Sequence, residues 1–225
     1  MRKPARNNFA YLLGGLLLLF VLQPSLRLYF GTTADMDVMR VPMLAAFGLF
    51  NIVSVWSLYR DRWVFHLGLV LVLLNGAIAM SALFFHSFIL EIFASVFVIL
   101  FAVLSCFIAG RHVFSLRDTN ANSLIGAICV YLLLGLIWAM VYSLFLILLP
   151  QGAFQGLVFD GKFSQFDNIL YFSFVTLTTA GYGDITPLNP LIRTIAYFEM
   201  ITGQFYMAIL VSGLVAHFMG IRMAR

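Results

Sequence analysis

The segment TLTTAGYGDITP, residues 176–187, interrupts long apolar runs with closely spaced threonines, glycines and an acid. Gly181 and Gly183 alternate with residues that carry side chains, and only glycine adopts both signs of φ without strain. Such alternation can turn successive backbone carbonyls to the same side, whereas an ordinary strand alternates between two faces. The segment therefore predicts an irregular backbone lined by carbonyl oxygens.

The composition of the 225 residues indicates which solvent surrounds the chain. Hydrophobic residues make up 63% of the chain and charged residues only 10%, which is more apolar than a soluble globular domain. The net charge is +4, and no basic stripe with interleaved aromatic residues points to nucleic acid as a partner. We therefore expect a protein of the cell membrane, with the lipid bilayer as its surroundings and spans of about 20 residues.

The apolar runs predict an all-α, multi-pass membrane protein with six transmembrane helices. Between the fifth and sixth spans, the apolar stretch at about 165–178 is too short to cross a bilayer. We interpret it as a re-entrant helix that begins near Ser164 and Asp167. The predicted spans are 9–26, 41–59, 63–85, 88–110, 122–149 and 191–220.

The basic residues orient these predicted spans. If the N-terminus is cytoplasmic, nine Lys and Arg residues flank the inner side and four flank the outer side, as the positive-inside rule requires. Both termini are then expected in the cytoplasm, and the segment 176–187 enters from the outside. The break at 111–123 divides the chain into a peripheral four-helix domain, 1–121, and a two-helix domain with the re-entrant loop, 122–225.

A row of carbonyl oxygens is a set of hard ligands for a dehydrated monovalent cation. One row cannot surround an ion, and with one such segment per chain the simplest ring is a homotetramer about a common axis. The carboxyl end of the short helix would direct its partial negative charge toward a waiting cation. Tyr182 would pack behind the row and fix its diameter.

Residues 169–187, ILYFSFVTLTTAGYGDITP, resemble the pore helix and signature filter of potassium channels. The resemblance covers about 122–220, is greatest with compact prokaryotic six-helix channels, and reaches the first four helices only as general architecture. It implies a tetrameric channel that conducts potassium ions passively and needs no cofactor. Residues 63–110 contain no Lys or Arg, so the peripheral domain is expected to share a voltage sensor's architecture without its moving basic charges.

The resemblance also implies roles for individual residues. The potassium ligands would be the carbonyl groups of four consecutive residues, with the hydroxyl of the first as an additional ligand at the inner end. The four residues are Thr179, Ala180, Gly181 and Tyr182. The other implied roles are an outer filter turn at Gly183, filter support by Thr178 and Asp184, and a gating hinge at Gly203.

Two positions depart from the family pattern. Ala180 replaces the usual valine, and Val175 stands where some members carry a glutamate that pairs with the filter aspartate. Because Ala180 removes packing volume, a weakly selective monovalent cation channel remains an alternative. A non-conducting membrane regulatory subunit is an alternative from another class. No Walker motif or catalytic constellation indicates an enzyme.

Three polar residues of the last predicted span have roles that the sequence leaves less defined. An acid inside a span is costly and has a partner, so we expect Glu199 to brace the filter through a hydrogen bond to Ser173 or Thr176. Gln204 either lines a cavity or bridges helices. His217 is either an interfacial residue or a sensor of cytoplasmic pH. The sequence does not identify the stimulus that would open the channel.

Overall fold

The computed structural model describes residues 9–30, 48, 62–84, 88–115, 121–149, 152–157 and 162–223. The predicted span at 41–59 therefore lies outside the described residues, apart from Gly48. The described elements, in chain order, are α1 (Phe9–Phe30), α3 (Arg62–Phe84), α4 (Phe88–Ser115), α5 (Ala121–Leu148), β1 (Phe154–Gln155), α6 (Lys162–Leu177), β2 (Thr186–Pro187) and α7 (Pro190–Met223).

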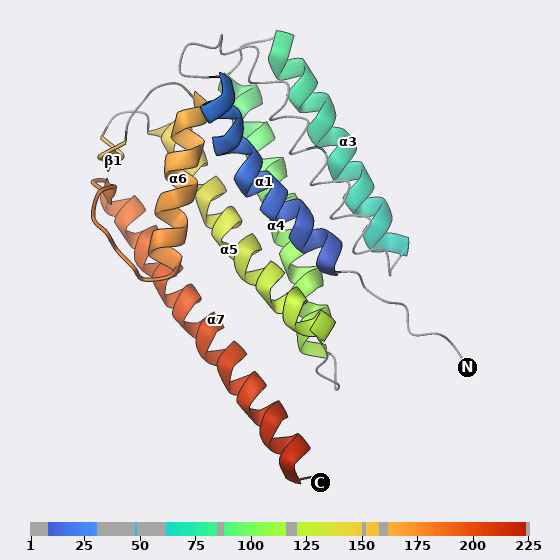
Figure 1. Cartoon of the computed structure of the whole chain (residues 1–225). Coiled ribbons are helices and arrows are strands. Elements are labelled where there is room, and N and C mark those ends of the chain that lie inside the picture. The colour runs from blue at the N-terminus through green and yellow to red at the C-terminus, as the bar shows by residue number, and fades with distance from the viewer. Residues whose placement is uncertain are drawn as a thin grey trace.

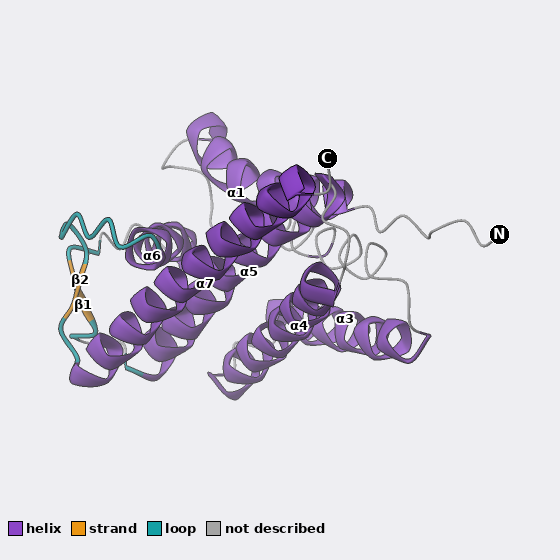
Figure 2. Cartoon of the chain, turned by 90° about the horizontal axis from the view of Figure 1, so that it is seen from below, coloured by secondary structure: helices purple, strands orange, loops and turns teal. Residues whose placement is uncertain are grey.

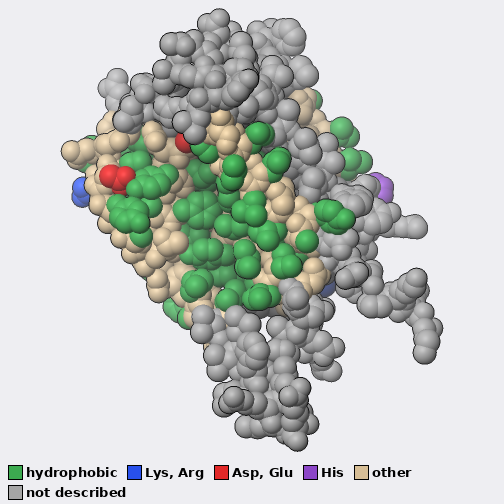
Figure 3. Space-filling view, viewed as in Figure 1, with side chains coloured by type: hydrophobic (Ala, Val, Ile, Leu, Met, Phe, Trp, Pro, Cys, Tyr) green, Lys and Arg blue, Asp and Glu red, His purple; other side chains and the backbone are tan. Residues whose placement is uncertain are grey.

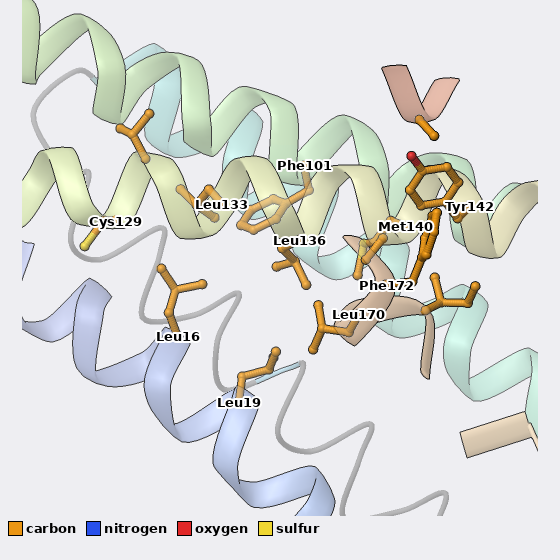
Figure 4. Packing of buried hydrophobic residues seen from close by; sticks show 14 of the residues in the cluster. Leu16, Leu19, Phe101, Cys129, Leu133, Leu136, Met140, Tyr142, Leu170 and Phe172 are labelled. Carbon is orange, nitrogen blue, oxygen red and sulfur yellow. The ribbon is translucent and has the colours of Figure 1, made fainter. Parts of the chain in front are cut away.

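Helix α5 is the centre of the arrangement, and it contacts α1, α4, α6 and α7 (Figure 1). A helix that is apolar on all sides is buried in protein or lipid, and α5 carries Leu133, Leu136 and Met140 toward its neighbours (Figure 4). Tyr206 of α7 donates a hydrogen bond to the Ala127 carbonyl oxygen of α5 at 2.5 Å. Figure 2 shows α3 and α4 on the side of α5 away from α6.

Two of the described helices are long and apolar enough to cross a membrane, namely Phe88–Arg111 and Asn122–Leu148. The described surface carries many exposed apolar side chains (Figure 3), among them Leu73 of α3 and Phe107 of α4. Soluble monomers rarely expose contiguous apolar surfaces of this kind. The surface of the molecule therefore suits a bilayer.

Helix α7 begins where its local sequence dictates. The Asn189 side-chain oxygen accepts a hydrogen bond from the Leu191 backbone N–H at 2.9 Å, which is the contact of an N-cap residue. Pro190 takes the first helical position, where its missing N–H leaves no intrahelical bond unmade. The prediction of a helix from 191 to about 220 is thus correct to within a few residues.

Helix α6 begins at Lys162, earlier than predicted, so the expected start near Ser164 is wrong. Lys162 and Phe163 are compatible with a helix, whereas the preceding Gly161 is a poor helix former. The helix ends at Leu177, and the chain then returns alongside α6 to the start of α7 (Figure 1). The short helix and the returning segment 178–189 position the candidate site.

Candidate functional site

The end of α6 is closed by the hydrogen bonds of a Schellman motif. The Thr179 N–H donates to the Thr176 carbonyl oxygen and the Ala180 N–H donates to that of Val175, both at 2.9 Å. In this motif the residue after the helix cap adopts the left-handed conformation and is usually glycine. Here it is Thr179, with φ of 59°. A side chain there costs about 1–2 kcal/mol, so the surrounding contacts must hold the threonine in place.

Positive φ recurs at every second residue after the helix. Gly181 has φ of 57° and Gly183 has φ of 79°, in sequence with the 59° of Thr179. The two glycines adopt the conformation that their alternation predicts. Thr179 does so as well, which the sequence did not indicate because threonine ordinarily avoids this region. Positive φ therefore occurs at every second residue of the backbone from 179 to 183. A row of carbonyls that face one side requires such an alternation.

The far end of this segment, from Tyr182 to Asp184, contacts Tyr171 of α6. The ring of Tyr182 is stacked on the ring of Tyr171, with centroids 6.5 Å apart and an interplanar angle of 18°. The Tyr171 hydroxyl is hydrogen-bonded to the Asp184 carboxylate, and this bond raises the pKa of the Tyr171 phenol above its ordinary value. Asp184 thus supports the segment through Tyr171, a partner that the sequence analysis did not name.

A two-stranded sheet holds the returning chain beyond the segment. β1 pairs antiparallel with β2, with Phe154 opposite Pro187 and Gln155 opposite Thr186. The Leu188 N–H donates to the Ala153 carbonyl oxygen at 2.9 Å. In addition, Arg193 Nε of α7 donates to the Pro187 carbonyl oxygen at 2.9 Å. The backbone after Asp184 is therefore fixed from both sides.

Gly156 directly follows β1 and lies against the backbone of Asp184. It has φ of 84°, and a Cβ added to it would overlap the Asp184 carbonyl oxygen. We expect Gly156→Ala to separate β1 from β2 and to cost about 1–3 kcal/mol, because both overpacking and left-handed strain act there. Thermal unfolding of the purified protein measures this cost.

Gly152→Ala is the matched control for this substitution. Gly152 lies in the same connection with φ of 72°, but a Cβ there meets no atom within 4 Å. Its alanine variant shares the strain and lacks the overlap. Equal melting temperatures for the two variants would show that the approach of Gly156 to Asp184 has no energetic consequence.

Glu199 of α7 is fully buried at 0% exposure, and two hydroxyl groups contact its carboxyl group. Tyr142 Oη of α5 lies 2.6 Å from Oε2, and Ser173 Oγ of α6 lies 2.5 Å from Oε1. The predicted hydrogen bond to Ser173 is therefore present. Tyr142 was missed, because nothing in the local sequence relates it to a residue 57 positions later. Glu199 of α7 thus joins that helix to both α5 and α6.

Tyr142 also belongs to an aromatic cluster that extends to the sheet. Its ring meets Phe172 of α6 edge to face at 5.2 Å between centroids and Phe154 of β1 at 5.9 Å. Phe154 and Phe172 meet at 5.1 Å. Edge-to-face pairs stabilise by about 0.5–1.5 kcal/mol beyond their area burial. One tyrosine thus connects α5, α6, β1 and, through Glu199, α7.

Gly203 and Gln204 of α7 contact the chain where α6 ends and the segment begins. A Cβ on Gly203 would overlap the Leu177 carbonyl oxygen at the end of α6. The structure therefore gives Gly203 a packing role, and the hinge stays a prediction, since α7 is one helix from Pro190 to Met223. Gln204 Nε2 donates to Thr179 Oγ1 at 2.9 Å, which is the bridging alternative. The His217 side chain lies outside the described residues.

The comparisons with known proteins give one match. No curated protein and no solved structure matches the chain. Residues 126–219, from within α5 to within α7, match the model of a family described as an ion channel. Together with the apolar helices, this match supports a location in the membrane. The stretch that contains α6, the alternating backbone and Glu199 therefore lies within the part of the chain that is similar to an ion channel family.

Proposed function

We propose that the protein is a potassium-selective channel that conducts passively through a filter formed by residues 179–183. The observation that carries this proposal is the alternating hand of the backbone at Thr179, Gly181 and Gly183. Carbonyl groups turned to one side replace the hydration shell of a dehydrated cation. In this proposal the potassium ligands are the carbonyls of Thr179, Ala180, Gly181 and Tyr182. Conduction of potassium ions then needs no cofactor.

A homotetramer completes the ring around the ion. Support comes from large side chains that the single chain leaves exposed, one on the proposed filter and others on α7. Tyr182 is 73% exposed and Phe205 is 66% exposed. Neighbouring copies arranged about a common axis would cover these side chains, as closed symmetry requires the same patch to be used by every subunit.

The membrane arrangement that fits this proposal is the six-span one with both termini in the cytoplasm. α6 is then the re-entrant helix, and its 16 residues are too few to cross a hydrocarbon core of about 30 Å. A helix that ends at membrane depth is tolerated where its backbone lines a water-filled path. The Schellman bonds at Val175 and Thr176 satisfy part of that backbone.

The proposal is tested by flux through the purified protein in potassium-loaded liposomes. We expect Gly183→Ala to abolish potassium-over-sodium selectivity. Gly183 has φ of 79° and a Cβ there meets no atom of the chain within 4 Å. Within the chain, the substitution therefore acts through the backbone preference at that position, by about 1–2 kcal/mol.

Gly152→Ala provides the control, because Gly152 has φ of 72° and equally open surroundings outside the filter. It should leave selectivity unchanged. Normal selectivity in Gly183→Ala would refute the carbonyl filter. Absence of cation flux through the unaltered protein would favour a non-conducting regulatory subunit instead.

A weakly selective monovalent cation channel is the second candidate, and Ala180 is the observation that favours it. Alanine leaves less volume behind the filter than the valine of the family pattern, and an under-filled site loses contacts. A bi-ionic reversal potential with potassium on one side and sodium on the other separates the two candidates. A reversal potential near zero would select the weakly selective channel.

A further inference from the structure

The adjacent threonines at the end of α6 have different hydrogen-bond partners. Thr178 Oγ1 donates to the Phe174 carbonyl oxygen of its own helix at 2.7 Å. Thr179 Oγ1 accepts from Gln204 Nε2 of α7 at 2.9 Å. Both Thr179 and Gln204 are exposed in the single chain, and in the proposed function the Thr179 oxygen faces the permeant ion. The inner end of the filter is thus fastened to α7 by one carboxamide.

The direction of this bond determines what the Thr179 oxygen offers to a cation. A hydroxyl group has one proton and two lone pairs, and the Gln204 N–H occupies one of the lone pairs. The same N–H places the positive end of its dipole beside the oxygen. The repulsion between that dipole and a cation grows with the charge of the cation. A divalent ion at this oxygen is therefore disfavoured more strongly than a monovalent ion.

We propose that Gln204 is a positioning residue that makes the innermost cation site less favourable for divalent ions than for monovalent ions. It does so because its carboxamide N–H donates a hydrogen bond to the Thr179 hydroxyl oxygen. The inference rests on the proposed function, in which this oxygen is the innermost ligand of the permeant ion. In a tetramer four carboxamides surround the axis, so their dipoles act together on one ion. No other described side chain donates a hydrogen bond to the Thr179 hydroxyl.

The test is block by Ba²⁺, a divalent ion close to potassium in size, added from the side on which α7 ends. Gln204→Met keeps the length of the side chain and removes its hydrogen bond. Gln204→Glu replaces the donor by an acceptor and adds negative charge. For each variant, the Ba²⁺ concentration that halves potassium flux in liposomes is measured. The potassium concentration needed to raise the melting temperature gives the monovalent affinity.

We expect Gln204→Met to lower the half-blocking Ba²⁺ concentration by about two- to tenfold, the range that one hydrogen bond accounts for. Gln204→Glu should lower it by more than about tenfold, because a carboxylate attracts the ion directly. In both variants, the potassium concentration needed to raise the melting temperature should change by a smaller factor than the half-blocking Ba²⁺ concentration. Thr202→Val is the control, since its hydroxyl donates to the Phe198 carbonyl oxygen within α7 at 2.8 Å.

The outcomes separate this inference from the proposed function. Unchanged or weaker Ba²⁺ block in Gln204→Met would overturn the inference, and so would equal changes for Ba²⁺ and potassium. Both results presuppose a potassium-selective flux in the unaltered protein. If that flux is missing, the proposed function fails, and the inference about Gln204 fails with it.

Discussion

Replacing Gly203 by alanine is expected to abolish cation flux and to lower the thermal stability of the protein by about 3 kcal/mol. A Cβ on Gly203 would overlap the Leu177 carbonyl oxygen, and its next contact is the backbone carbon of the same residue. A backbone group at the end of a helix cannot rotate away as a flexible side chain does, so α6 or α7 must move. Overpacking of this kind costs about 1–3 kcal/mol or more, and here the displaced residue, Leu177, lies two positions before the first residue of the proposed filter.

Gly213→Ala is the matched control for Gly203→Ala. Gly213 lies ten residues later on the same helix, and a Cβ there meets no atom within 4 Å. Its alanine variant should conduct normally and melt no lower than the unaltered protein, since alanine favours a helix over glycine by about 1 kcal/mol. Flux and melting temperature measured together decide the matter. A stable, conducting Gly203→Ala variant would contradict the packing role.

The second large effect concerns the buried carboxyl group of Glu199. Glu199→Leu leaves the hydroxyls of Tyr142 and Ser173 buried and without this partner. The Tyr142 hydroxyl is then left without the partner shown here, which costs about 1–3 kcal/mol, whereas the Ser173 hydroxyl keeps the Gly135 carbonyl oxygen as a partner. We therefore expect a strong fall in melting temperature and loss of potassium-selective flux, because α5, α6 and α7 are no longer joined behind the filter.

Glu199→Gln, in contrast, is expected to be tolerated. Ser173 Oγ lies 2.8 Å from the Gly135 carbonyl oxygen as well as 2.5 Å from Glu199 Oε1, yet a hydroxyl has one proton. Both contacts are hydrogen bonds at once when the carboxyl group carries a proton and donates it to Ser173. Glutamine reproduces that pattern, with an amide N–H toward Ser173 and an oxygen that accepts from Tyr142.

The comparison of the two Glu199 variants is informative in either direction. If glutamine is as damaging as leucine, the carboxyl group acts as an anion, and the proton count around Ser173 is wrong. A double-mutant cycle of Glu199→Gln with Tyr142→Phe then apportions the loss between the two hydroxyl contacts. Melting temperature in detergent and flux in liposomes are the two measurements.

Much of the candidate site follows from the sequence because its determinants are local. The conformation of Gly181 and Gly183 is a property of glycine and of its spacing, so the alternation was predictable without a fold. The contact between Glu199 and Ser173 was predictable because an acid in an apolar helix needs a hydroxyl or amide partner, and the neighbouring short helix carries few. The apolar runs also gave α5 and α7 to within a few residues.

The parts that the sequence did not predict depend on tertiary arrangement. Tyr142 and Glu199 are 57 residues apart, and Gln204 and Thr179 are 25 apart, so no periodicity within one helix relates them. The pairing of β1 with β2 involves two residues on each strand, too few for an alternating pattern to be recognised. The role of Gly156 emerges only when its distance to Asp184 is known.

The central position of α5 has a consequence for how the two halves of the chain communicate. α3 packs on α4 and α4 packs on α5, whereas α6 and α7 reach the rest of the described molecule mainly through α5. Among the described elements, a displacement that starts in α3 or α4 therefore reaches α6 and α7 mainly through α5. Tyr142 stands at the end of that route, with its ring against Phe172 and its hydroxyl on Glu199. A tilt of α5 would therefore displace Phe172 of α6 and Glu199 of α7 at the same time, because Tyr142 contacts both residues.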